Sequence, residues 1–188
     1  MIFKTLDILT TKMGEFINHK FNSDEKILVL SSPAEANEQN NTSVINKMLL
    51  TLVNVERETI MGINFKSQSV GNTYYTSRPP LSLNLYVLVS ASFVEKNYPE
   101  SLKYLSAALE FFQANDLITK ENTPGLDHSI AQIHLEFVNL SIHELSNLWS
   151  ILGSKYLPSF LMKVRMLTID GSEISTVGIS TEKIKTNF

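Results

Sequence analysis

The side chains of this 188-residue chain that could do chemistry are few and scattered. Its histidines are His19, His128, His134 and His143, and no two of them stand four residues apart, the spacing that puts two zinc ligands on one face of a helix. We expect His134 to point outward from a strand and His143 to lie in the first turn of a capped helix. The histidines therefore do not predict a metal site.

Two adjacent pairs could serve acid–base catalysis. Asp127 could orient His128 as a general base, but the pair follows Pro124-Gly125 in an expected turn, where such pairs are more often without chemistry. Asp24 and Glu25 precede the first expected strand, and nothing there holds two carboxylates at a fixed separation. An enzyme with a shallow polar site at Asp127-His128 is the least favoured of three hypotheses.

Composition excludes several classes of function. The chain has no cysteine, which removes disulfides, thiol nucleophiles and cysteine-bound zinc. Its net charge of −3 gives no basic field for a nucleic-acid backbone, and it contains no glycine-rich phosphate loop or nucleophile-elbow motif. We assign no catalytic, cofactor-binding or metal-ligating residue and predict a protein that is not an enzyme and takes no small-molecule substrate.

Hydropathy predicts an ordinary globular chain in which 43% of residues are hydrophobic and 19% are charged. No apolar run approaches the roughly 18 residues of a membrane span. Asp7, Glu15 and Lys20 interrupt the first twenty residues, so no signal peptide is expected there. We expect one domain that does not insert into a membrane and stays in the cytoplasm until something moves it.

The first half of the chain predicts one helix and three strands. Apolar residues three and four apart predict a helix over residues 2–20, and a short strand follows at Ile27–Leu30. Val44–Glu58 favours a long strand, although part of it also fits a helical period. Polar loops are expected at 33–43 and 62–80. Strict alternation over Leu81–Phe93 predicts a long strand with one buried face.

The second half predicts two helices and two strands. Asn97 is expected to cap a helix from Tyr98 to about Asn115, with a buried stripe of Leu102, Leu105, Leu109 and Phe112, widened by Ala108 and Phe111. A turn over 119–129 leads to a strand at Ile133–Phe137. Ser141 and Glu144 form a capping box for a helix that buries Leu145, Leu148, Trp149 and Leu152 and closes at Gly153.

The last expected strand is Tyr156–Asp170. One of its faces carries Phe160, Met162, Val164, Met166 and Thr168. Residues 171–188 are expected to form a polar tail that becomes ordered only when a partner binds it. This order predicts the α+β class: a single domain with a mostly antiparallel or mixed sheet flanked by about three helices.

Three aromatic residues are candidates for an interface. Trp149 shares a helical stripe with Leu145 and Leu152, so a core position is favoured over an interface hot spot. Tyr74 and Tyr75 lie in the expected polar loop with no core to fill, and both interpretations stay open for them.

Several segments together resemble one known family. They are LTLVNVERET, LSLNLYVLVSASF after Pro79-Pro80, SLKYLSAALEFFQ, and NLSIHELSNLWSILGSKYLPSFLMKVRMLTID, with Leu148-Trp149 and Val164-Arg165 in the positions that the family pattern requires. Their order over residues 1–170 is similar to that of the tail-terminator, or cap, proteins of extracellular contractile injection systems of the antifeeding-prophage and virulence-cassette type. Residues 171–188 lie beyond this pattern.

The resemblance implies a structural cap without catalytic residues. It implies a homo-hexameric ring that ends the inner tube and anchors the last sheath layer of a phage-tail-like particle. Such a particle is assembled in the bacterial cytoplasm and can later be released from the cell. The resemblance gives residues 1–170 as the cap domain. For the polar C-terminal tail, residues 171–188, we expect a role as an interaction arm, because the tail is polar and the chain offers a long strand to receive it.

Strand addition is the mode of attachment that we expect, with Val44–Glu58 as the receiving edge and Glu173–Ile179 as the arm. The alternative hypothesis is a stand-alone adaptor or chaperone that binds extended peptides at a sheet edge.

Overall fold

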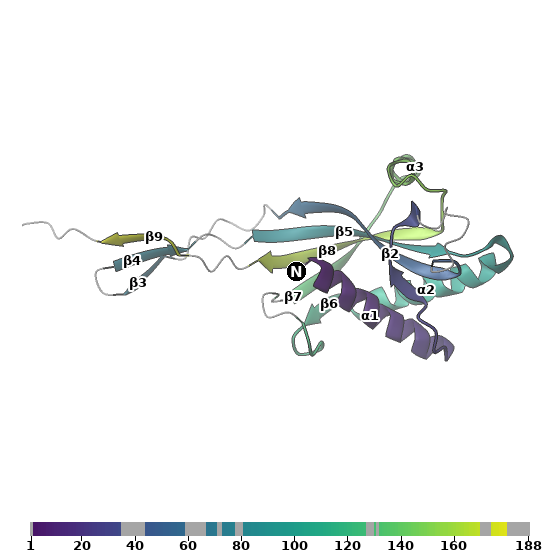
Figure 1. The fold of residues 1–188 in the computed structure, drawn as a ribbon, viewed down its shortest axis with the longest axis horizontal. Helices are drawn as coiled ribbons and strands as arrows, with labels where there is room; N and C mark the ends of the chain where they lie inside the picture. The colour runs from purple at the N-terminus through teal and green to yellow at the C-terminus, as the bar shows by residue number, and fades with distance from the viewer. Residues whose placement is uncertain are drawn as a thin grey trace, which may run out of the picture.

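A six-stranded sheet forms the centre of the structure, a computed structural model (Figure 1). The structure describes residues 2–34, 44–58, 67–70, 73–77, 81–126, 130, 132–169 and 174–179, with side chains in 2–34, 44–58, 82–126, 130 and 132–165. The strands in spatial order are β1 (Leu28–Leu30), β2 (Lys47–Arg57), β5 (Leu81–Ser92), β8 (Ser159–Ile169), β7 (Gln132–Val138) and β6 (Leu117–Thr119). Only β1 and β2 run parallel, so the sheet is mixed.

Three helices cover this sheet. Helices α1 (Ile2–Phe21) and α2 (Tyr98–Ala114) pack on one face, whereas α3 (Ile142–Ile151) packs on the opposite face (Figure 1). A short 3₁₀ turn over Glu95–Asn97 leads into α2. The predicted α+β class with three flanking helices is confirmed.

The main core lies between the sheet and the pair α1 and α2. Leu85, Val87 and Val89 of β5 meet the buried stripe of α1, which contains Leu6, Leu9, Met13 and Ile17. Phe16 of α1 and Phe111 of α2 make an edge-to-face contact with ring centroids 5.7 Å apart. Burial of each such large side chain contributes about 1.5–3 kcal/mol, so these helices fold with the sheet rather than before it.

The second face of β5 is also covered, which corrects the prediction of one buried face. Leu88 packs with Trp149 of α3 and Leu161 of β8, and Ser90 is fully buried. The alternation identified the strand correctly, but it could not show that α3 folds back over the polar side. Ser82 and Ser92 are buried on this strand as well.

A bulge in β2 changes which face its side chains occupy. Leu52 pairs with Val87 and Asn54 with Tyr86, so Val53 is an extra residue. Before the bulge, Met48 and Leu50 face α1 and α2. After it, even-numbered residues face the α3 side, because one inserted residue reverses the alternation. The acidic side chains of Glu56 and Glu58 therefore lie on the α3 side of the sheet, away from the main core that α1 and α2 cover.

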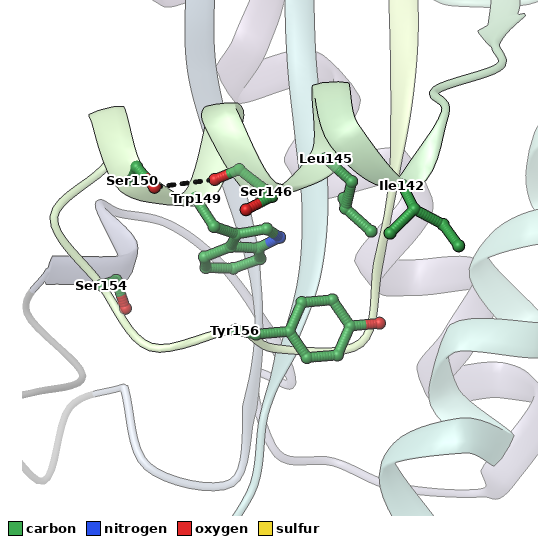
Figure 2. A pocket seen from close by; sticks show the side chains of 7 residues that line it. All are labelled: Ile142, Leu145, Ser146, Trp149, Ser150, Ser154 and Tyr156. Carbon is green, nitrogen blue, oxygen red and sulfur yellow. Dashed lines mark hydrogen bonds between the residues drawn. The ribbon is translucent and has the colours of Figure 1, made fainter.

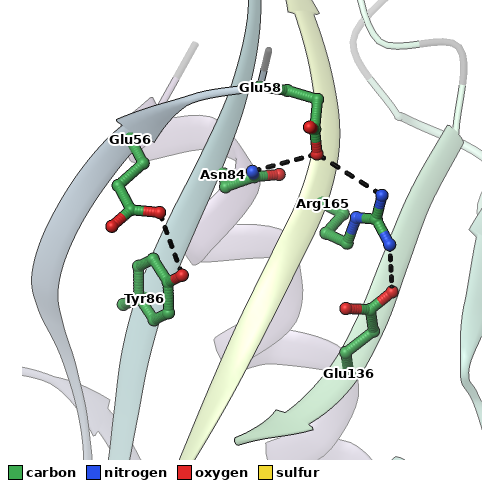
Figure 3. A network of polar contacts seen from close by, with 6 residues as sticks. All are labelled: Glu56, Glu58, Asn84, Tyr86, Glu136 and Arg165. Atoms are coloured by element: carbon green, nitrogen blue, oxygen red, sulfur yellow. Dashed lines mark hydrogen bonds and ion pairs between the residues drawn. The ribbon is translucent and has the colours of Figure 1, made fainter. Parts of the chain in front are cut away.

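These acids join a polar network on the part of that face that α3 leaves open (Figure 3). Glu58 accepts hydrogen bonds from Asn84 at 3.1 Å and Arg165 at 3.4 Å, and Arg165 also donates to Glu136 at 2.6 Å. The bond to Glu136 raises the pKa of the Arg165 guanidinium, which keeps it charged. A second bulge places Arg165 beside Asn84, because β5 and β8 shift register between Leu83 and Leu85.

Tyr86 continues this network toward α3. Its hydroxyl donates to Glu56 at 2.9 Å, and Lys163 lies 5.7 Å from the centroid of its ring. Burial of the phenol, followed by the bond to Glu56, raises the pKa of Tyr86 above its ordinary value. The tyrosine therefore separates the charged part of this face from the apolar part.

Helix α2 starts and ends where the sequence predicts, but two details differ. Asn97 occupies the N-cap position, but its side chain makes no capping hydrogen bond, and its amide instead donates to the Asn46 side chain at 3.4 Å. Leu102 and Leu109 are 40% and 37% exposed, because the helix is rotated so that Ala107, Ala108 and Phe111 face the core. The two alanines and Phe111 occupy the side of α2 that packs on the sheet, so Leu102 and Leu109 lie at its margins.

The prediction of a polar loop over 62–80 was wrong where the structure describes it. Strands β3 (Ser67–Val70) and β4 (Thr73–Ser77) pair antiparallel, and β4 carries Tyr74 and Tyr75. Two residues, Gly71-Asn72, separate them in the sequence, which is a hairpin signal that the low hydropathy of the segment obscured. Residues 35–43, expected as a loop, lie outside the described residues.

Other elements agree with the sequence or extend it. Val44–Glu58 contains a strand rather than a helix, and Ile27–Leu30 and Tyr156–Asp170 contain β1 and β8. Phe160, Met162 and Val164 are buried on one face as predicted; the side chains of Met166 and Thr168 lie outside the described part. The strand β6 was not predicted, because its three residues precede the expected turn too briefly to show alternation.

The capping box of α3 is confirmed and makes stability depend on pH. Glu144 accepts hydrogen bonds from the backbone N–H and the hydroxyl of Ser141, both at 2.8 Å, and these bonds lower the pKa of its carboxyl. A carboxyl whose pKa is lower in the folded than in the unfolded state stabilises the fold at any pH above its unfolded-state pKa. This contribution is lost as the pH falls through its folded-state pKa.

We expect Glu144→Ala to remove this pH-dependent contribution. The difference in free energy of unfolding between wild type and variant should be largest near neutral pH. It should shrink as the pH falls below 4.5, the ordinary pKa of a glutamate carboxyl. Urea unfolding followed by circular dichroism measures it. Ser141→Ala removes one of the two donors to Glu144, so its free energy of unfolding plotted against pH should fall between the curves of wild type and Glu144→Ala. Identical curves for wild type and Glu144→Ala would contradict the prediction.

The polar network predicts a second stability effect. Glu58 keeps only 4% of its side chain exposed, whereas Arg165 keeps 30%. Arg165→Gln should lower the free energy of unfolding by about 1–3 kcal/mol, because the buried carboxylate loses its cationic partner. Lys163→Gln, on the same strand and face, is the matched control and should cost at most about 0.5 kcal/mol. Equal losses for the two variants would show that the pairing with Glu58 does not matter.

Candidate docking surfaces

The residues that could have served catalysis are separated in the structure. Asp24 and Glu25 are exposed before β1, and Glu25 forms a 3.6 Å ion pair with Lys47. His19 is exposed near the end of α1. His134 lies 3.0 Å from the Gln132 side chain, and His143 lies 3.3 Å from that of Asn147.

The pair Asp127-His128 lies outside the described residues. Within the described residues, no three His, Cys, Asp or Glu side chains form a group that could hold a metal ion. The same part of the chain contains no helix that is both long and apolar enough to cross a bilayer.

The edge of β2 is less accessible than the sequence suggested. Strand β1 pairs with Met48–Leu50, which corrects the prediction that all of Val44–Glu58 is a receiving edge. Beyond that point the bulge at Val53 bends the edge, and the Asn54 side chain accepts the backbone N–H of Val55 at 2.9 Å. Bulges and local side-chain bonds of this kind protect an edge from pairing with another chain.

A second edge opens on β7. Strand β6 pairs only with Gln132–His134, and the next N–H on that side, from Leu135, donates to Asp116 at 2.8 Å. Among the described strands, none pairs with Phe137 or Val138 on this side. Phe137 is 46% exposed and contacts the rings of Phe112 and Phe160, so this part of the edge is both open and apolar.

The three-stranded sheet is a separate feature, set beyond the ends of β5 and β8 (Figure 1). Its order is β3-β4-β9, where β9 is Ile174–Ile179. Tyr74 pairs with Gly178, so the segment predicted as an arm meets the tyrosines of its own chain. The expectation that this tail is ordered only by a partner therefore does not hold for Ile174–Ile179.

A hollow of about 350 Å³ lies between α3 and the segment that follows it (Figure 2). It is lined by Ile142, Leu145, Ser146, Trp149, Ser150, Ser154 and Tyr156. Trp149 is 4% exposed and packs with Leu88 and Leu161, so the core interpretation is correct. The same indole also forms a wall of the hollow, which helical spacing alone could not reveal.

Local structure holds this hollow open. The capping box begins α3 at Ile142, and Gly153 ends it with φ of +63°, a left-handed conformation that turns the chain back. Tyr156 then meets Trp149 edge to face with ring centroids 5.8 Å apart. The hydroxyl of Ser154 donates to the carbonyl of Pro33 at 3.1 Å and ties this segment to the residues after β1.

The chain matches a family model and is similar in fold to solved structures. The model of the family described as "Pvc16 N-terminal domain" matches residues 7–182, which extends past residue 170, where the sequence resemblance ended. No curated protein matches the sequence.

One solved structure, a PVC sheath/tube terminator in the extended state, from an extracellular contractile injection system, is similar with a TM-score of 0.57 and 12% identity over 96% of this chain. Another, the tube-terminating cap of the anti-feeding prophage, has a TM-score of 0.54 and 11% identity over 76% of this chain. This chain spans 62% and 49% of those chains, and the likeness is one of fold. The family match, which covers most of the chain, shows that the protein belongs to the Pvc16 N-terminal domain family, the tail-terminator family that its sequence resembles.

Proposed function

We propose that this protein is a structural cap of a contractile injection system. In this proposal a ring of six copies ends the inner tube and anchors the last sheath layer, without catalysis. The observation that carries the proposal is the family match over residues 7–182, and the fold shared with proteins named as sheath/tube and tube terminators supports it.

The physical requirement for such a part is asymmetry. Rings that stack head to tail use a heterologous contact, which repeats without limit unless a different subunit stops it. A cap needs one surface that binds the tube and another that does not continue the stack. A sheet covered by helices on one face and in part on the other, with short edge strands, supplies a surface of the kind that stacks poorly.

We assign the attachment roles to two parts of the chain. Residues 1–170 form the cap domain, and residues 171–188 form an interaction arm of which β9 is the described part. The three-stranded sheet that β9 completes pairs the arm with β4, beyond the ends of β5 and β8 (Figure 1). Assembly takes place in the bacterial cytoplasm, and the finished particle can be released from the cell.

The adaptor hypothesis keeps one supporting observation, the open and apolar edge of β7 at Phe137 and Val138. An adaptor would be a monomer that binds loose extended peptides there. A cap would form rings of about six copies, alone or on a tube. Native mass spectrometry of the chain with tube rings distinguishes a monomer from a ring.

We expect particles made without this protein to have uncontrolled tube lengths or unstable sheaths. The reason is that nothing would then halt the heterologous stacking of rings. Electron microscopy of particles purified with and without the chain measures the length distribution. Particles of normal, uniform length in its absence would refute the cap proposal.

We expect a chain that ends at Asp170 to dock poorly on particles and still fold. The truncation removes β9 from the three-stranded sheet but leaves the six-stranded sheet, whose strand β8 ends at Ile169. Co-sedimentation with particles measures docking, and circular dichroism checks the fold. Normal docking by the truncated chain would remove the role given to the arm.

A further inference from the structure

The open edge of β7 offers backbone groups to a further strand. In an antiparallel strand, alternate residues turn their N–H and C=O groups to the same side. The N–H of Leu135 donates to Asp116 on the β6 side, so the N–H and C=O of Phe137 also point to that side. The described residues supply no partner for these two groups of Phe137. A strand that joined the sheet here would therefore bond to Phe137.

The surroundings of this edge fit an uncharged strand that carries apolar residues. On one face of the sheet, the ring of Phe137 is 46% exposed and lies against Phe112 of α2. On the other face, the described lining of a hollow of about 170 Å³ contains no ionisable side chain. Edges that stay unpaired usually carry charges or bulges. Neither Phe137 nor Val138 is charged, and β7 keeps a regular register with β8 up to Val138.

Strand β9 has a free edge and the matching chemistry. It pairs with β4 on one side, and its other side pairs with no strand that the structure describes. After the bulge at Ser175, its regular part is Thr176–Ile179, which contains no charged residue. Val177 and Ile179 are two positions apart, so they lie on one face of the strand. The other outer strand, β3, contains Val70 as its single apolar residue and fits less well.

The three-stranded sheet needs a further contact for its stability. A sheet this small is stable by itself only when it has a hydrophobic face or packs against a helix. Strands β3 and β4 are mostly polar in sequence, and no described helix covers them (Figure 1). Pairing of β9 with a strand outside its own sheet would add backbone hydrogen bonds and apolar contact.

Within one chain, β9 lies too far from the open edge of β7 to pair with it. Phe137 pairs with Met162 of β8, and β8 continues to Ile169 before the chain leaves toward β9. At roughly 3.3 Å per residue, this stretch of β8 is about 23 Å long. The three-stranded sheet, where β9 pairs with β4, lies beyond the far end of β8 (Figure 1). A pairing of β9 with β7 therefore joins two copies of the chain.

We propose that the free edge of β9 pairs with Phe137 at the open edge of β7 in a neighbouring copy, so that strand addition joins adjacent subunits of the ring. This inference rests on the proposed cap function. The contact is heterologous, because the added strand and the receiving edge are different parts of one chain. Such a contact closes into a ring when the rotation between copies divides a full turn. Each copy then uses one β9 and one β7 edge.

Disulfide cross-linking of the full-length chain tests this pairing. The chain has no cysteine, so every cross-link within it or between its copies comes from introduced residues. Asn139 is exposed two residues after Phe137 on the same edge. Asn139→Cys is combined in turn with Thr176→Cys, Val177→Cys, Gly178→Cys or Ile179→Cys, because a disulfide forms only in a register that brings the two cysteines close together.

Each double variant is assembled into particles, oxidised, and run on a denaturing gel without reductant. We expect one register to give a ladder of linked chains that ends at the size of the ring. Mass spectrometry of the bands identifies the linked proteins. A cross-link within a single chain, which keeps the mass of one chain, would overturn the proposal.

A cysteine at the edge of β2 provides a matched control. Val55 is 39% exposed on the bent part of this edge, where the Asn54 side chain already accepts its backbone N–H. Val55→Cys, combined with the same cysteines in β9, should give about tenfold less linked product, because a disulfide needs two strands held close together. Equal yields from the two edges would overturn the assignment to β7.

The outcomes separate this inference from the cap function. If native mass spectrometry shows rings with the tube but no double variant links two copies, the pairing is wrong and the cap proposal stands. Links to the sheath or tube protein in place of a second copy also overturn the choice of partner. If the chain neither forms rings nor stays on particles, the cap function itself fails, and the pairing fails with it.

Discussion

The register of β5 between β2 and β8 determines the rest of the structure. This strand lies at the centre of the sheet, and its alternate residues must be covered on two sides. Leu85, Val87 and Val89 need α1 and α2, whereas Leu88 needs α3. Because a slip of one residue would exchange these two sets, each helix can pack on only one side.

The two bulges reconcile this register with the charges of the neighbouring strands. In β2, apolar Met48 and acidic Glu56 are both even-numbered, so a regular strand would put them on one face. The extra residue Val53 sends the acid to the opposite face, where it bonds to Tyr86. In β8 a similar shift brings Arg165 to Asn84 and Glu58. The polar network and the irregular strands thus depend on each other.

Alternation and helical periodicity predicted much of this fold, because burial on one face leaves a regular trace in the sequence. They identified the long strand at Leu81, the helix of residues 2–20 and the capping box at Ser141. They could not locate β6, which has only three residues, or the pair β3 and β4, whose short sequences are mostly polar. The rotation of α2 was missed because the leucines dominate the periodicity, whereas Ala107, Ala108 and Phe111 are the apolar residues that the helix buries.

The candidate surfaces were less predictable, because they depend on which edge is covered and which polar atom is left unpaired. We predicted β2 as the receiving edge because its segment is long. In the structure, pairing with β1, the bulge at Val53 and the Asn54 side chain protect this edge from pairing with another chain.

The features that make β2 a poor partner suit an end piece. Strands β1 and β6 have three residues each, and the outer part of β2 is bent and charged, so most of the described sheet margin resists pairing. The opening at Phe137 and Val138 adjoins the hollows beside α3. A subunit with one strand edge that can pair, on a sheet whose other edges cannot, can bind a neighbour without extending the sheet further. Selective attachment of this kind depends on where backbone hydrogen-bonding groups at the strand edge remain unpaired.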